Sequence, residues 1–192
     1  SGGGGGSASG TLNHCTLSGN TALGSKGGGA WLGTLNNCTL SGNTASSGGG
    51  SYWATLNNCT LSGNTASYGG GGSYRGTLNN CTLTGNTANG YGYGGGSFDS
   101  TLNNCTISGN VATNGCGTYI GFLRNCIVWG NTLTNGLTDN YSGGTFSYSC
   151  TTPLPAGAGN IALDPSFVSA NDLRLRGGSP CIDGGNNSYA TL

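Results

Sequence analysis

The residues that could do chemistry are few and scattered. The 192-residue chain contains one His, His14, and five acidic residues, all Asp: Asp99, Asp139, Asp164, Asp172 and Asp183. Cleavage of a polysaccharide needs acidic groups paired across the scissile bond, but no two Asp residues occupy equivalent repeat positions. The C-terminal Asp residues suit turns, and His14 has no Ser or carboxylate partner that would make it a base. We therefore predict that the protein is not an enzyme.

Metal binding also lacks a pattern. Zinc ligands usually come as Cys pairs two to four residues apart, and none of the nine Cys residues forms such a pair. A calcium site among Asp164, Asp172 and Asp183 would need several more oxygen ligands. We predict no metal and no cofactor.

Six Cys residues instead mark a repeat. They lie 21 to 24 residues apart: Cys15, Cys38, Cys59, Cys81, Cys105 and Cys126. Each stands in a copy of one phrase, which reads Thr-Leu-Asn-Asn-Cys-Thr-Leu-Ser-Gly-Asn-Thr-Ala from Thr34 to Ala45. A short fixed period is typical of a solenoid, in which these Cys residues would form an inward column of small apolar side chains. The spacing of stacked turns would also allow disulfides between neighbours.

Cys116 lies outside this column. It replaces the middle Gly of a turn, between Gly115 and Gly117. We predict a surface thiol there, either inert or able to cross-link two molecules.

The alternation within each repeat predicts short strands. Leu35 points opposite to Thr34 and Asn36, and Cys38 and Leu40 point opposite to Thr39 and Ser41. Asn37 is predicted at a bend, and Gly42-Asn43 closes the second strand. A third short strand is expected after each Gly triplet. It would place one aromatic column inside the coil: Trp31, Tyr52, Tyr74, Phe98 and Tyr119.

Three short strands per turn predict an all-β protein, a parallel β-helix of about seven rungs. Residues 1–150 would form the repeats, and 151–192 an irregular C-terminal cap in the same domain. Asn side chains should also stack in a column at a bend: Asn20, Asn43, Asn64, Asn86, Asn110 and Asn131.

The outward side chains of the second strand are also repeated. They form two columns, one of Thr16, Thr39, Thr60, Thr82 and Thr106 and one of Ser18, Ser41, Ser62, Thr84 and Ser108. Hydroxyl-bearing residues are common at exposed strand positions. The grid is also similar to the flat Thr face of β-helical antifreeze proteins, and it is the candidate binding face.

Composition excludes two classes of partner. Charged residues make up 5% of the chain and the net charge is zero, so nothing attracts nucleic acid. No apolar run reaches the ~18 residues of a membrane span.

The repeats resemble those of bacterial secreted and surface right-handed β-helix proteins, of the pectate-lyase-like superfold and the polymorphic outer-membrane type. The tail supports this through Asp164-Pro165-Ser166-Phe167-Val168 and Ser179-Pro180-Cys181-Ile182-Asp183-Gly184. The resemblance implies an extracellular or cell-surface location. It also implies a disulfide between Cys150 and Cys181, which resemble a pair retained together in related segments.

Three functions remain open at this point. The favoured one is a structural protein of the cell surface or of an extracellular filament, assembled by end-to-end stacking of β-helices, because Thr11 already begins a full rung. The second is an adhesin or passenger-type domain that binds a glycan or cell-surface partner through its lateral faces. The third is ice binding by the Thr/Ser grid.

Overall fold

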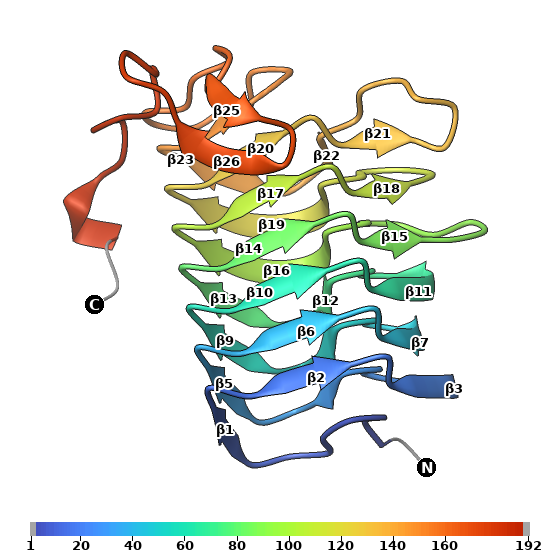
Figure 1. The fold of residues 1–192 in the computed structure, drawn as a ribbon. Coiled ribbons are helices and arrows are strands. Elements are labelled where there is room, and N and C mark those ends of the chain that lie inside the picture. Colours follow the sequence, from blue (N-terminus) through green and yellow to red (C-terminus); the bar gives the residue numbers. More distant parts are fainter. Residues whose placement is uncertain (1–2, 190–192) are drawn as a thin grey trace.

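The computed structural model describes residues 3–189. The chain winds into a parallel β-helix whose successive turns lie one above another along a single axis (Figure 1). Three parallel sheets run along this axis, with eleven, seven and six strands. The predicted all-β solenoid is confirmed, and the rung count is close to the seven expected.

The strands of the three sheets are short. Sheet A contains β1 (Thr11–Asn13), β4 (Ala30–Trp31), β5 (Thr34–Asn36), β8 (Ser51–Tyr52), β9 (Thr55–Asn57), β12 (Ser73–Tyr74), β13 (Thr77–Asn79), β16 (Ser97–Asn103), β19 (Thr118–Arg124), β22 (Tyr141–Ser142) and β23 (Thr145–Ser147). Sheet B contains β2 (Thr16–Ser18), β6 (Thr39–Ser41), β10 (Thr60–Ser62), β14 (Thr82–Thr84), β17 (Thr106–Ser108), β20 (Ile127–Trp129) and β24 (Cys150–Thr151). Sheet C contains β3 (Thr21–Lys26), β7 (Thr44–Ser47), β11 (Thr65–Gly69), β15 (Thr87–Ala88), β18 (Val111–Ala112) and β21 (Thr132–Leu133).

Identical residues stack on one another because neighbouring turns pair in register. In sheet B, Leu61 pairs with Leu40 on one side and with Leu83 on the other. All three side chains are fully buried. Each buried Leu contributes about 1.5–3 kcal/mol, so repeated columns of Leu and Cys provide a continuous core along the axis.

The Asn column at the second bend is confirmed as a ladder of amides. The Asn43 side chain donates to the Asn64 side-chain oxygen at 2.9 Å and to the Leu17 carbonyl at 2.9 Å. The Asn64 oxygen also accepts the Asn43 backbone N–H at 3.0 Å. Asn43 and Asn64 are both fully buried, and the ladder satisfies polar groups that would otherwise lose their hydrogen bonds to water.

The first bend needs a left-handed backbone. Asn37 has a φ of 54° and Asn58 one of 53°. Among residues other than Gly, Asn adopts this conformation most readily. The predicted bend at Asn37 is confirmed.

The predicted short strand after each Gly triplet is confirmed, but each turn contains a further strand. The Thr-Ala pairs form sheet C, which the pattern analysis missed, with Ala45 and Ala66 buried and Thr44 and Thr65 outside. The strands after the Gly triplets join sheet A.

The aromatic column was also assigned to the wrong side. The strands after the Gly triplets instead point four hydroxyl side chains into the coil, and all four are fully buried: Ser51, Ser73, Ser97 and Thr118. Their hydroxyls satisfy one another, as Ser51 Oγ donates to Ser73 Oγ at 3.0 Å. The aromatic residues therefore point outward, because side chains alternate along a strand and a phase error of one residue reverses the face.

After β24 the chain leaves the solenoid. The tail contains an antiparallel hairpin, β25 (Phe167–Ser169) and β26 (Asp172–Leu175), and ends in the short 3₁₀ helix η1 (Asn187–Tyr189). Figure 1 shows the tail over the C-terminal end and one side of the coil. Within the described range, no helix is long and apolar enough to cross a membrane.

Candidate functional site

The Thr/Ser grid lies on the outer face of sheet B, as predicted. Its two columns are in register from β2 to β17, with Thr60 paired to Thr39 and Thr82. Thr39 and Thr60 are exposed, whereas Thr82 and Thr106 are half-buried. The columns do not continue into β20, where Ile127 follows Thr106 and Trp129 follows Ser108.

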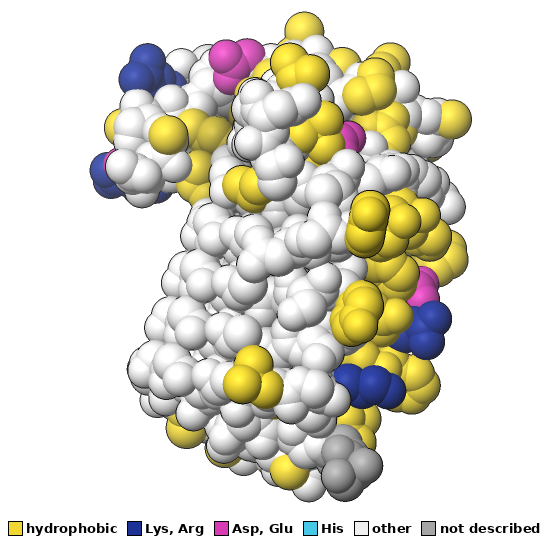
Figure 2. Space-filling model, turned by 90° about the vertical axis from the view of Figure 1, so that its right-hand side faces the viewer, with side chains coloured by type: hydrophobic (Ala, Val, Ile, Leu, Met, Phe, Trp, Pro, Cys, Tyr) yellow, Lys and Arg dark blue, Asp and Glu magenta, His cyan; other side chains and the backbone are white. Residues whose placement is uncertain are grey.

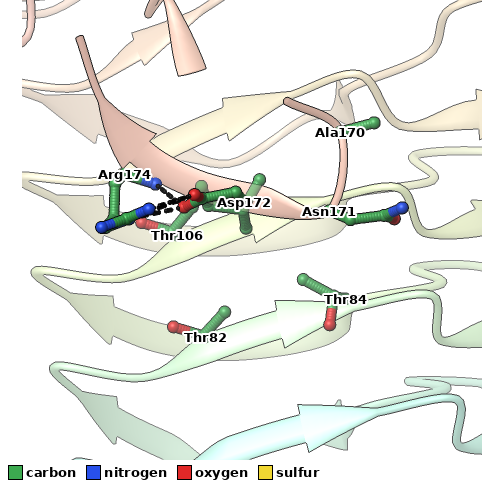
Figure 3. A pocket seen from close by; sticks show the side chains of 8 residues that line it. Thr82, Thr84, Thr106, Ala170, Asn171, Asp172 and Arg174 are labelled. Atoms are coloured by element: carbon green, nitrogen blue, oxygen red, sulfur yellow. Dashed lines mark hydrogen bonds and ion pairs between the residues drawn. The ribbon is translucent and has the colours of Figure 1, made fainter. Parts of the chain in front are cut away.

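The tail hairpin causes this difference in exposure. It overhangs the upper rungs of sheet B and encloses a groove of about 530 Å³ with Thr82, Thr84 and Thr106 as its floor (Figure 3). The hairpin side of the groove is formed by Ala170, Asn171, Asp172, Leu173 and Arg174. The open grid is therefore limited to the lower rungs, and ice binding stays a prediction for that part.

Asp172 and Arg174 form an ion pair at the rim of the groove. Arg174 Nη2 lies 2.6 Å from Asp172 Oδ2, and Nε donates to Oδ1 at 2.9 Å. Hydrogen bonds from Arg174 lower the pKa of Asp172 to about 2. The carboxylate is therefore ionised at neutral pH and already paired, so it is not poised as a general acid.

The Cys column is buried from Cys38 to Cys126, as predicted, whereas Cys15 at its start is half-buried. Cys59 Sγ donates to the Leu35 carbonyl at 3.4 Å and accepts the backbone N–H of Cys38 at 3.4 Å. Burial raises the pKa of Cys105 well above its usual value. All nine Cys residues are free in the structure, and the column forms part of the hydrogen-bonded core.

The prediction of a surface thiol at Cys116 is wrong. Cys116 is fully buried against Ala88 and Ala112. Its Sγ lies 3.5 Å from Asp139 Oδ2, and Asp139 in turn accepts the Gly115 N–H. Burial raises the pKa of Cys116 to about 12. The turn folds inward here, so this thiol is neither accessible nor reactive.

Cys150 and Cys181 are brought together but are not bonded in the structure. A hydrogen bond between the two thiols raises the pKa of Cys150 and lowers that of Cys181. Both line a small cavity of about 120 Å³ between the last rungs and the tail. The predicted pairing is therefore supported by position, and the disulfide itself stays a prediction.

The Asp and His residues do not form a catalytic cluster. His14 lies exposed at the first bend, in the position of Asn37 in the next rung. Asp99 pairs with Arg75 at 2.8 Å, and Asp164 caps a turn at Ser166. Among residues 3–189, no three His, Cys or Asp side chains converge as metal ligands.

The clearest surface feature without an assigned role is a column of aromatic side chains, which the sequence analysis predicted inside the coil. We define the aromatic band as Trp31, Tyr52, Tyr74, Phe98 and Tyr119. Its members pair in register on the outer face of sheet A, where Tyr52 is buried and the other four side chains are half-buried. Ring centroids are 5.0 Å apart for Tyr52 and Tyr74, and 4.6 Å apart for Tyr74 and Phe98. Figure 2 shows hydrophobic side chains gathered along this edge, with charged side chains against them.

A second outward column borders the band. It consists of the next residue in each turn: Leu32, Trp53, Arg75, Asp99 and Ile120, all with φ between 47° and 62°. Trp53 is 53% exposed, and its ring lies nearly parallel to that of Tyr52, 6.3 Å away. This column varies from turn to turn, whereas the core columns repeat.

The N-terminal end of the band is hollowed. One hollow of about 330 Å³ is lined by Lys26, Trp31, Leu32, Tyr52 and Trp53. A second, of about 580 Å³, is lined by Gly24, Ser25, Lys26, Trp31, Ser46, Ser47 and Tyr68. Lys26 and Trp31 are common to both, and we call the pair of hollows the Lys26 cleft. The spacing of the Trp residues was visible in the sequence, but their side of the strand was not.

Comparison with known proteins agrees with this architecture. The family model described as right handed beta helix region matches residues 5–153. Neither the curated proteins nor the solved structures contain a match. Because the family match covers most of the chain and the structure shows the corresponding solenoid, the protein belongs to the right-handed β-helix family.

Proposed function

We propose that this protein is a non-enzymatic, extracellular β-helix of adhesin or passenger type, which binds a glycan through its lateral aromatic band. The observation that carries the proposal is the outward position of the band over five successive rungs. Four of its five rings are half-buried and the neighbouring Trp53 is exposed, and aromatic side chains gathered on an outer face are typical of binding surfaces.

The chemistry of the band suits a sugar. Tyr and Trp offer apolar surface together with a polar O–H or N–H, and a sugar ring has an apolar C–H face and a hydroxyl rim. Tyr74 also has the Arg75 guanidinium 5.5 Å from its ring centroid. Aromatic surface and hydrogen-bond donors thus occur side by side along the axis.

The Thr/Ser grid supports binding less well. It offers hydroxyls without aromatic surface, and the hairpin covers Thr82 and Thr106. The hydroxyl columns are therefore a suitable control face.

A glycan array with the purified protein tests this function. We expect binding that Tyr74→Ala together with Phe98→Ala weakens about tenfold or more, since stacked rings at an interface contribute several kcal/mol jointly. Thr39→Ala on the open grid should leave binding unchanged. Circular dichroism establishes that each variant is folded. Array binding that survives the loss of both rings would refute the proposal.

End-to-end assembly into a filament stays a prediction. The tail lies over the C-terminal end of the coil (Figure 1), so stacking through that end would require the tail to move. Negative-stain imaging at high protein concentration decides between rods one molecule wide and single particles.

A further inference from the structure

The Lys26 cleft differs from the rest of the aromatic band in its charge. Lys26 is the only Lys in the chain, and its Nζ lies 4.9 Å from the centroid of the Tyr52 ring. Arg75 and Arg174 are each neutralised by a carboxylate. Within residues 3–189, Lys26 has no carboxylate within ion-pair distance. The cleft therefore contains an exposed positive charge held against an aromatic face.

The two hollows of the cleft have different linings. The smaller one is apolar apart from Lys26, with Trp31, Leu32, Tyr52 and Trp53 around it. The larger one adds the hydroxyls of Ser25, Ser46 and Ser47 to Trp31 and Tyr68. Both volumes fall in or near the range of small-molecule sites, in which a mainly aromatic lining carries a few polar groups.

The backbone holds two of these side chains in an unusual conformation. Leu32 has a φ of 62° and Trp53 one of 53°. The left-handed region costs such residues about 1–2 kcal/mol. In the described turns, the position equivalent to Leu32 and Trp53 is occupied by Gly at one place, Gly143. The strained bend projects Leu32 and Trp53 outward at the rim of the cleft.

We propose that the Lys26 cleft binds a sugar that carries an anionic group, with its C–H face against the Trp rings and its anion at Lys26 Nζ. This inference rests on the proposed glycan-binding function and adds the class of ligand. An ammonium group is a compact point charge, so a carboxylated and a sulfated sugar share the required chemistry.

Calorimetric titration with three lactose derivatives tests the proposal. The probes are 3′-sialyllactose, 3′-sulfolactose and lactose, which differ in carboxylate, sulfate and no charge. We expect both anionic sugars to bind about tenfold more tightly than lactose, which corresponds to ~1.4 kcal/mol. Their affinity should fall as salt is added. The anionic sugar that binds more tightly shows whether the cleft prefers a carboxylate or a sulfate.

Three variants separate charge from stacking. Lys26→Gln should reduce the affinity for the anionic sugars to that for lactose. Arg75→Gln, which removes a cation already paired with Asp99, is the matched control and should change affinity less than twofold. Trp53→Ala should weaken all three sugars about tenfold.

Each other outcome decides against the proposal. If lactose binds as tightly as the charged sugars, or if Lys26→Gln has no effect, the anionic class is wrong while glycan binding by the band stands. If neither charged sugar binds at about 10 mM, enough to detect a millimolar Kd, the cleft is not this site, and the array still decides the function of the band. A dimer in sedimentation that Trp53→Ala abolishes would assign the cleft to a second copy of the chain.

Discussion

The repeated coils and the tail are held together in different ways. In the coils, equivalent strands pair with one another turn after turn, and in the core columns the same side chains meet in successive turns. The tail instead depends on one hairpin, on a short parallel bridge between Ile161 and Cys150, and on single side-chain contacts. For example, Ser179 Oγ donates to the Pro165 carbonyl at 2.6 Å. Stability is therefore distributed along the coils and local in the tail.

This difference also determines where unique sites occur. A repeated coil displays the same side chain many times, so an unrepeated site needs a break in the repetition. The tail creates one such break at the groove over Thr82 and Thr84. The other lies at the N-terminal end of the aromatic band, where Trp53 of the variable column and Lys26 of β3 line one hollow. Sites of this kind cannot be inferred from an average repeat.

Leu61→Asp should have the largest effect, because it places an unpaired charge in a fully buried column. We expect a loss of roughly 5 kcal/mol or more in the free energy of unfolding, measured by denaturant titration. Leu23→Asp is the matched control, since Leu23 is 81% exposed in β3 and should lose less than about 0.5 kcal/mol. A stable Leu61→Asp protein would show that the coils do not depend on their core columns.

Asn125→Ala should release the tail and leave the coils intact. The Asn125 amide accepts the Asn186 N–H at 2.9 Å and donates to the Asn186 carbonyl at 3.0 Å. Loss of both bonds, about 1–3 kcal/mol, should speed amide hydrogen exchange in residues 186–189 about tenfold or more.

Asn37→Ala is the control for that experiment. Asn37 occupies the same left-handed bend, with φ of 54° against 53° for Asn125, so both variants carry the same backbone penalty. Unchanged exchange in Asn125→Ala, or an equal increase in Asn37→Ala, would mean that this contact does not anchor the tail.

Thr60→Val should have the smallest effect. Thr60 is exposed on the open part of the grid, so the free energy of unfolding should change by less than about 0.5 kcal/mol. Thermal unfolding followed by circular dichroism measures it. A large loss would indicate that the open rungs, like those under the hairpin, pack against another surface.

The core columns could be predicted from the sequence because their spacing is regular. Leu35, Cys38 and Leu40 alternate with Thr and Asn in each copy, and one consistent period places them all inside. The bend at Asn37 followed from the slip in that alternation, and the Asn43 ladder from a polar residue repeated at a fixed position.

The side on which the aromatic band and Cys116 lie was mispredicted, for a different reason in each case. The strands that carry Tyr52 and Tyr74 are two residues long, too short for alternation to define a face. Left-handed residues such as Trp53 then reset the phase. The orientation of the Gly115–Gly117 turn depends on Asp139, 23 residues after Cys116.

The amino-acid sequence by itself determined the stacking of like on like, because in-register burial of identical Leu, Cys and Asn residues satisfies both apolar and polar groups in every turn. Only the tertiary structure decided which outer faces are usable. Bends with positive φ turned the aromatic residues outward, and the tail folded back over Thr82 and Thr106. Both depend on contacts between residues far apart in the chain, which a local pattern does not contain.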